Sequence, residues 1–224
     1  MPGQGTAAAR DHDAHSRDRV RIALVEDHVI VREALAIVLT NEGFEIVLQA
    51  GDAESAAGPL LALEPAAAII DIGLPGDSGV QLAKRVAAEA PSIAVVLFTG
   101  TDDPRRLAEA TACGARGLVL KSADLQRVVR ALRSVVAGGT YVDPSLRSLL
   151  LERATTHAVG ALSPREREVL DLISQGHTVE GVAAVLVIAP DTVRTHIRNA
   201  IRHLEAENRT HAIALALRSG EIAL

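Results

Sequence analysis

The chain has 224 residues, a formal charge of −5 and a single cysteine. This length suits one large domain or two small ones, and the acidic balance excludes a protein coated with basic residues for nucleic-acid binding. No apolar run approaches the ~18 residues of a membrane span, so no membrane partner is expected. Residues 1–19 lack the apolar centre of a secretory signal and are predicted to be a disordered tail. One cysteine allows no internal disulfide and is typical of the reducing cytoplasm, where we expect the protein.

Short apolar runs alternate with stretches of helical period over the first 140 residues. The runs, rich in Val, Ile and Leu as in strands covered on both faces, are residues 21–25, 45–50, 66–70, 93–98 and 117–120. The clearest helical stretches are residues 29–39, 79–88 and 122–136. This alternation is typical of α/β proteins, so we predict a doubly wound, five-stranded parallel sheet over residues 20–138.

The last third of the chain shows only helical patterns. Ser163, Pro164 and Glu166 form a capping box with proline at the first helical position, which predicts a helix start. Three further helices are expected over residues 178–186, 190–205 and 209–218. We therefore predict a small all-α domain over residues 161–224, joined to the α/β domain by a linker at residues 139–160.

Acidic, hydroxyl and basic side chains follow four of the expected strands. Glu26 and Asp27 come after the first strand, Asp71 after the third, Thr99 after the fourth and Lys121 after the fifth. The carboxyl ends of parallel strands meet at one edge of a sheet, where ligands of such folds bind. We therefore expect these side chains to lie together.

This set of side chains favours a phosphate site that uses a cation. Clustered carboxylates repel one another, and Mg²⁺, which takes carboxylate and carbonyl ligands such as Gly73 O, relieves the repulsion. With the metal in place, an ionised Asp71 is able to attack phosphorus and form an acyl phosphate. Lys121 and Thr99 suit the phosphoryl oxygens. The alternative is a strand-ending Asp that begins a turn and a solvated lysine.

The order of these motifs resembles a known family. The matching segments are VEDH at 25–28, DIGLPGDSG at 71–79, FTG at 98–100 and GARGLVLKSA at 114–123. On these segments, residues 20–136 resemble the receiver domain of two-component response regulators, which implies a flavodoxin-like fold. The resemblance implies that Asp71 accepts a phosphoryl group from a sensor histidine kinase. It also implies that Mg²⁺ is held by Glu26, Asp27, Asp71 and the Gly73 carbonyl. Thr99 and Lys121 are the residues that it implies sense the phosphoryl group.

One position of the receiver motif differs from the usual pattern. Three residues before the lysine, the family often has a Tyr or Phe that swings inward on activation, and this chain has Leu118. Leucine lacks the hydroxyl and the bulk of that aromatic ring. Leu118 is therefore the switch position of this chain, with a side chain of different chemistry.

The helix expected at 190–205 has one apolar and one basic face. Its apolar face consists of Val193, Ile197, Ala200, Ile201 and Leu204. Arg194, Arg198 and Arg202 form a stripe on the far side, next to Thr195. Such a helix suits the major groove of DNA, where arginine contacts phosphates or guanine and threonine contacts a base. The alternative is an ordinary solvated face.

The helical domain also resembles a known family. LSPREREVLDLISQG at 162–176 and DTVRTHIRNAIRHLEAENRTHAIALAL at 191–217 are similar to the LuxR-type helix-turn-helix domain. The resemblance implies that the helix at 190–205 reads DNA through Arg194, Thr195 and Arg198. It also implies that the fourth helix contributes to a homodimer, which would read an inverted repeat.

The second helix of this domain departs from that family. At residues 178–183, TVEGVA replaces the usual Ser-Asn-Lys-Glu-Ile-Ala, so that Glu180 stands for a lysine and Gly181 for a glutamate. Ala189 occupies a position where an N-cap serine is common. We expect Glu180 to lie near phosphate and repel it. Residues 155–224 carry seven arginines against eight acids, so a monomer is expected to bind DNA weakly and with a shallow salt dependence.

Together, these patterns predict a transcriptional regulator and not an enzyme. Phosphorylation of Asp71 is expected to shift dimerisation and DNA binding. An adaptor that has lost DNA binding is one alternative, suggested by Glu180 and Gly181. A hydrolase with an aspartyl nucleophile is a second, although such enzymes often carry another acid at the position of Gly73.

Overall fold

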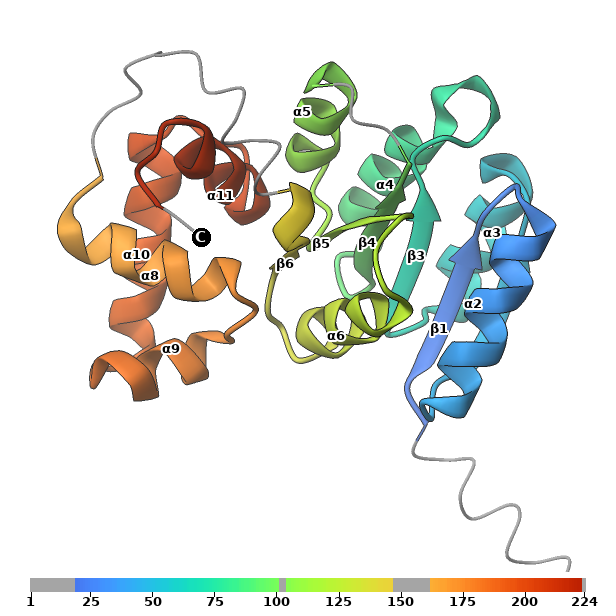
Figure 1. Ribbon diagram of the computed structural model, residues 1–224, viewed down its shortest axis with the longest axis horizontal. Coiled ribbons are helices and arrows are strands. Elements are labelled where there is room, and N and C mark those ends of the chain that lie inside the picture. The colour runs from blue at the N-terminus through green and yellow to red at the C-terminus, as the bar shows by residue number, and fades with distance from the viewer. Residues whose placement is uncertain (1–18, 101–103, 147–161, 223–224) are drawn as a thin grey trace, which may run out of the picture.

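The computed structural model describes residues 19–100, 104–146 and 162–222. The tail predicted at 1–19 and the linker predicted at 139–160 therefore lie largely outside the described residues. Figure 1 shows a layered α/β part beside a cluster of helices. Within the described parts of the chain, no helix is both long and apolar enough to cross a bilayer.

A single parallel sheet forms the centre of the first part. Its strands are β1 (Arg21–Val25), β2 (Glu45–Ala50), β3 (Ala67–Asp71), β4 (Ala94–Thr99), β5 (Gly117–Leu120) and β6 (Tyr141–Val142). They lie in the order β2-β1-β3-β4-β5-β6, and all are parallel. The direction of winding reverses between β1 and β3, which is the place where doubly wound sheets hold their ligands.

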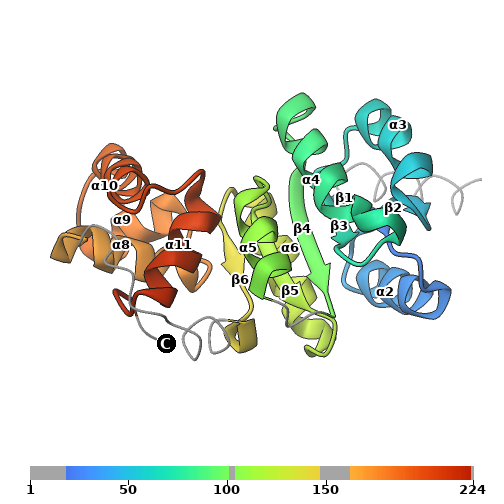
Figure 2. The same cartoon turned by 90° about the horizontal axis from the view of Figure 1, so that it is seen from above.

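Helices cover both faces of the sheet and confirm the doubly wound class. They are α2 (Val29–Asn41), α3 (Ala53–Leu63), α4 (Ser78–Glu89), α5 (Pro104–Ala112) and α6 (Leu125–Val136). Buried residues of α2 and α6 share one core cluster, and those of α3, α4 and α5 belong to the other. Figure 2 shows α2 on the opposite side of the sheet from α3 and α4. Helices α3 and α5 were not delimited from the sequence.

All five predicted strands are present, and the sheet also has a short sixth strand that was not predicted. Tyr141 pairs with Gly117 and Val142 with Leu118, inside the stretch predicted as linker. A two-residue strand carries no periodicity by which a sequence reveals it. Gly139 permits the turn before it, because a Cβ there would lie 2.6 Å from Ser134 Oγ.

Over residues 162–222, the second part has the four predicted helices. They are α8 (Pro164–Ser174), α9 (Val179–Leu186), α10 (Pro190–His203) and α11 (Arg209–Arg218). The capping box of α8 is confirmed: the Ser163 hydroxyl accepts from Glu166 N, and the Glu166 carboxylate accepts from Ser163 N at 3.1 Å. On α10, the predicted apolar face is buried at Val193, Ile197 and Ala200.

Candidate functional site

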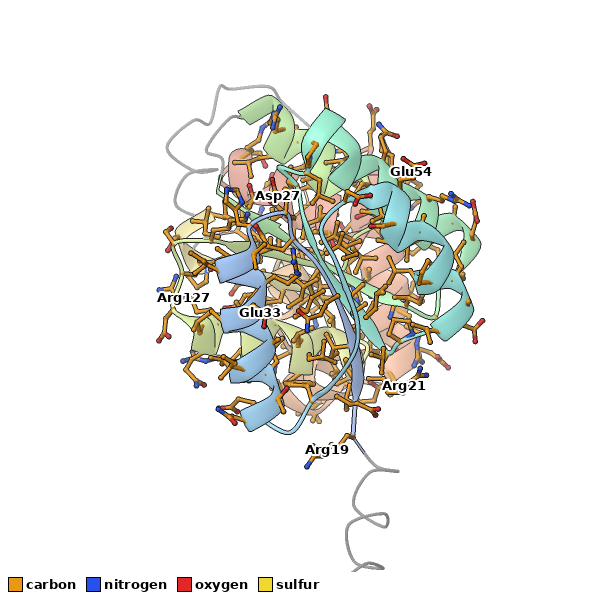
Figure 3. All side chains as sticks on the ribbon, turned by 90° about the vertical axis from the view of Figure 1, so that its right-hand side faces the viewer. Arg19, Arg21, Asp27, Glu33, Glu54 and Arg127 are labelled. Carbon is orange, nitrogen blue, oxygen red and sulfur yellow. The ribbon has the colours of Figure 1, made fainter. Side chains whose placement is uncertain are left out.

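The edge at the carboxyl ends of the strands gathers the predicted side chains. Lys121 Nζ lies 2.8 Å from Glu26 Oε1 and 2.9 Å from Asp71 Oδ2. Glu26, Asp71 and Thr99 are at most 2% exposed, whereas Asp27 is partly exposed. Figure 3 shows Asp27 at this edge, where β1 ends and α2 begins. The lysine therefore bridges acids from two different strands.

The register of the sheet explains why these strand ends are level. Asp71 pairs with Phe98 across β3 and β4, and Thr99 pairs with Leu120 across β4 and β5. Lys121 continues the ladder by donating its backbone N–H to Thr99 O at 2.6 Å. The residues of β1, β3, β4 and β5 are mostly apolar and buried, and a polar side chain stands at the carboxyl end of each of these strands.

The charges of this edge compensate one another only in part. Burial lowers the pKa of the Lys121 ammonium, but its hydrogen bonds to Glu26 and Asp71 outweigh burial and raise that pKa above its ordinary value. Glu26 Oε2 is buried and has no hydrogen-bond partner among the described residues. Single ligand atoms of Glu26, Asp27, His28 and Asp71 all lie within 4.8 Å of one another. An unsatisfied buried carboxylate oxygen within such a set fits a hard divalent cation.

A pocket of about 400 Å³ opens at this cluster. Its lining residues are His28, Asp71, Ile72, Gly73, Thr99, Gly100, Arg106 and Lys121. Sequence reasoning missed His28 and Arg106 as parts of the site. His28 Nδ1 lies 3.1 Å from Glu26 Oε1 and 2.7 Å from Asp27 Oδ1, and its place directly after the acid pair was a usable signal. Arg106 lies on α5, and no motif around it marked it as part of a site.

Two glycines shape the surroundings of Asp71. Gly73 N donates to Asp71 Oδ1 at 2.8 Å, so the loop that follows β3 helps to orient the Asp71 carboxylate. A Cβ on Gly79 would lie only 1.9 Å from Asp71 O, so the start of α4 approaches the strand as closely as a glycine permits. The role of Gly79 was not predicted, although its motif was recognised.

The predicted switch residue is a buried residue of β5. Leu118 is 1% exposed and belongs to the same core cluster as Leu107 and Ala110 of α5. Its backbone carbonyl accepts from Asp143 N at 2.9 Å, beyond β6. The position is thus joined through its carbonyl to the segment that follows β6.

The predicted DNA-contact residues share the exposed face of α10. Arg194, Thr195, Arg198 and Arg202 are all exposed. The Thr195 hydroxyl donates to Asp191 O at 2.9 Å, and Arg202 Nη2 donates to Asn199 Oδ1 at 3.2 Å. A basic stripe on a helix whose other face is buried is the arrangement expected for groove reading.

Glu180, which we expected to lie near phosphate and repel it, has an ion-pair partner in the structure. Its carboxylate Oε1 lies 3.1 Å from Arg194 Nη2, so the side chain is paired with a predicted DNA-contact residue. Gly181 occupies the first turn of α9, where its N–H donates to Thr178 Oγ1 at 3.1 Å. The helix is therefore capped and regular in spite of both departures. Ala189 makes no side-chain cap, as expected.

The start of α11 is bonded to the α/β part. Asn208 Nδ2 donates to Ala112 O at 3.1 Å, and the Thr210 hydroxyl donates to Ala115 O at 2.6 Å. Arg209 Nη2 donates to two carbonyls just beyond α6, those of Gly138 and Gly139, both at 3.0 Å. Figures 1 and 2 both show α11 between α10 and the sheet. This contact covers α11 and leaves the basic face of α10 exposed.

The side chain of Arg209 is partly buried at this contact. Burial, and secondarily the charge of Arg116, lower the pKa of Arg209 to about 10. A second bond crosses in the other direction, from Ser134 Oγ to Gly176 O at 3.1 Å. Carbonyls at helix ends carry partial negative charge, which favours a cation there.

Comparison with known proteins agrees with this architecture. Residues 22–133 match the response regulator receiver domain, and residues 160–216 match the LuxR family of bacterial regulatory proteins. A probable transcriptional regulatory protein NarL of Mycobacterium tuberculosis is 32% identical over 205 residues, which cover 90% of this chain and 95% of that protein.

Solved structures of a response regulator are similar over most of the chain. The RcsB response regulator of Salmonella typhimurium is 26% identical, has a TM-score of 0.57, and is matched over 85% of this chain and 94% of its own. A structure of two RcsB dimers bound to two parallel DNAs is also 26% identical, with a TM-score of 0.55, over 88% of this chain and 96% of that one. The chain therefore belongs to the LuxR-family response regulators and is a phosphorylation-controlled, DNA-binding regulator of transcription.

Proposed function

We propose that Asp71 is the phosphoacceptor of this regulator. A histidine kinase supplies the phosphoryl group: the P–N bond of its phosphohistidine breaks as a bond forms between phosphorus and an oxygen of Asp71. The observation that carries this assignment is the pocket at the carboxyl edge of the sheet, into which Asp71 opens beside Lys121. A compact ammonium group 2.9 Å from the carboxylate is suited to the transferred phosphoryl oxygens.

The same edge is proposed to hold Mg²⁺ through Glu26, Asp27, Asp71 and the Gly73 carbonyl. Oxygen Oε2 of buried Glu26 supports this, because no donor among the described residues reaches it. Bound Mg²⁺ neutralises charge that gathers on the phosphoryl oxygens. Position 73 offers no second carboxylate, which supports a regulator over a phosphate-ester hydrolase.

Thr99 and Lys121 are proposed to sense the phosphoryl group. Once Asp71 is phosphorylated, a phosphoryl oxygen offers the Lys121 ammonium a new hydrogen-bond acceptor. Lys121 is then able to replace its bond to Glu26 Oε1 by a bond to the phosphoryl group. Leu118 of β5 belongs to the same core cluster as Leu107 and Ala110 of α5, and the end of α5 accepts a hydrogen bond from Asn208, so a shift of this core is expected to reach the contact with α11. We therefore place the switch in the path from Lys121 through Leu118 to α5.

The output is proposed to be release of α11. In the present arrangement, the receiver covers α11 through Asn208, Arg209 and Thr210, and the family uses this helix in dimers. Loss of the contact frees α11 to pair with a second copy. Two copies would present two α10 helices to an inverted repeat, with Arg194, Thr195, Arg198 and Arg202 as DNA contacts. The dimers of RcsB on DNA support this assembly.

The domains are proposed to be a receiver over 20–138, a linker over 139–160 and a DNA-binding domain over 161–224. Since β6 lies within that linker, its first residues belong to the folded receiver. In bacteria, both the DNA and the phosphohistidine of the kinase lie in the cytoplasm, so we place this regulator there.

The test is phosphorylation of the full chain by a small phosphodonor such as acetyl phosphate. Asp71→Asn is expected to abolish the phosphorylated band on a phosphate-affinity gel. Asp52→Asn is the matched control, because asparagine caps a helix as well as the aspartate does at the start of α3. Labelling of Asp71→Asn at the parent rate would refute the assignment. Selection from random DNA with phosphorylated protein then identifies the repeat.

A further inference from the structure

The HTH helices hold one of the predicted DNA-contact arginines between two acids. Arg194 Nη2 lies 3.1 Å from Glu180 Oε1 of α9, and Arg194 Nη1 lies 2.8 Å from Asp191 Oδ1 of α10. The three side chains are between half and almost fully exposed. Among the described residues, Arg198 and Arg202 of the same stripe form no ion pair with an acid. Arg194 is therefore electrostatically different from its neighbours.

We infer that Glu180 is a specificity-determining positioning residue, which acts through Arg194 to favour base contacts over phosphate contacts. The inference rests on the proposed DNA-reading role of Arg194. Phosphate recognition depends on net positive charge, and the group of one arginine and two acids has a net charge of −1 instead of +1. A phosphate that approaches this group gains little, and sequence-independent binding is mostly phosphate binding.

Recognition of a base edge has different requirements. Guanine presents two neutral acceptors, O6 and N7, and an arginine reads them with two directed N–H groups. A guanidinium has five N–H groups, of which the two acids engage one on each terminal nitrogen, so three remain. Glu180 reaches Arg194 from the neighbouring helix, and a guanidinium fixed from two helices has less orientation to lose on binding. The pairing thus weakens non-specific binding and retains base readout.

Exposure of the pair explains why this effect concerns binding and not folding. Exposed ion pairs contribute little to stability. Glu180 lies in the first turn of α9, where the helix dipole favours a negative charge and Thr178 provides the cap independently. Removal of the Glu180 charge is therefore expected to leave the fold unchanged and to make the electrostatic potential at Arg194 more positive.

The experiment compares full-length Glu180→Gln with the parent on two fluorescent duplexes. One carries the sequence recovered by selection, and the other is a scrambled duplex of the same composition. Without its partner acid, Arg194 is released to contact a phosphate, and a pair of unit charges roughly 5 Å apart in water contributes about a factor of four, so Glu180→Gln is expected to bind the scrambled duplex about fourfold more tightly. The slope of log K against log [KCl] becomes steeper by about 0.9 per protomer, because one more phosphate contact forms. The ratio of specific to non-specific affinity falls.

Two further variants separate this mechanism from bulk charge. Glu168→Gln removes the same charge from α8, where Glu168 pairs with Arg165, and is expected to leave slope and ratio unchanged. In an Arg194→Gln background, Glu180→Gln is expected to have little effect, because the residue through which it acts is gone. Glu180→Ala provides a second substitution, and thermal unfolding verifies that all variants are folded.

Several outcomes overturn the inference. It fails if Glu180→Gln behaves like Glu168→Gln, or if its effect persists without Arg194, since Glu180 then repels DNA directly. It also fails if specific and non-specific affinity fall together. Failure of the selection to enrich any sequence would instead refute DNA reading by α10, and the scrambled-duplex comparison would still decide whether Glu180 screens Arg194.

Discussion

The contact between α11 and the receiver makes a quantitative prediction for Thr210→Val. The Thr210 hydroxyl donates to Ala115 O at 2.6 Å, and both groups are buried where the two domains meet. Valine keeps the shape of threonine and removes the donor, so Ala115 O is left without this partner. Loss of a hydrogen bond to a buried carbonyl costs roughly 1–2 kcal/mol. We expect the equilibrium to shift roughly five- to thirtyfold towards separated domains, because each 1.4 kcal/mol is a factor of ten.

Two measurements on the unphosphorylated full chain test this prediction. Small-angle X-ray scattering is expected to show a larger radius of gyration for Thr210→Val, and fluorescence anisotropy is expected to show tighter binding to the selected duplex. Ser219→Ala is the matched control, because its hydroxyl lies on the same helix and donates only to Leu215 O and Ala216 O within it. If the two variants are equally compact and bind DNA equally, the contact does not restrain α11.

Three further predictions concern the receiver edge and the helical domain. Gly79→Ala is expected to destabilise the protein by about 3 kcal/mol in urea unfolding, because its Cβ would overlap Asp71 O. Asp27→Ala is expected to weaken Mg²⁺ binding at least about tenfold by isothermal titration. Burial raises the pKa of Glu166, but bonds from His203 and Ser163 outweigh it and hold the pKa below the ordinary 4.5. The stabilisation from Glu166 is thus present above pH 4.5 and lost as the pH falls below it. The urea concentration at the unfolding midpoint is therefore expected to fall less on acidification in Glu166→Gln than in the parent.

Each of these predictions has an outcome that contradicts it. An unchanged urea midpoint for Gly79→Ala would mean that α4 moves away from Asp71 without cost. Unchanged Mg²⁺ affinity in Asp27→Ala would remove Asp27 from the metal site. Glu168→Gln serves as the control for Glu166→Gln, and equal acid sensitivity of the two variants would assign the effect to general charge.

The receiver edge was predictable because its residues follow strands. Glu26, Asp71, Thr99 and Lys121 each stand where an apolar run ends, and parallel strands bring such ends to one edge without further information. Sequence spacing therefore translated directly into proximity. The capping box of α8 was predictable for a similar reason, since all its atoms lie within one turn.

Features that depend on packing between distant segments were not predictable in this way. The pairing of Glu180 with Arg194 joins residues of two helices, and a sequence does not reveal which rotamers meet. Arg106 reaches the pocket only because α5 lies at the same edge. The two-residue strand β6 forms because β5 offers it a free side, which is a property of the sheet and not of Tyr141 or Val142.

The hydrogen bonds between the two domains are more sensitive to substitutions on one side of the contact than on the other. Three consecutive side chains of the DNA-binding domain, Asn208, Arg209 and Thr210, donate to main-chain carbonyls of the receiver. Every amino acid supplies such a carbonyl, so side-chain replacements at Ala112 or Ala115 leave the acceptors in place. A screen for variants that act without a kinase should therefore recover substitutions at 208–210 far more often than at their acceptors. The receiver surface is correspondingly free to diverge while it still restrains its partner domain.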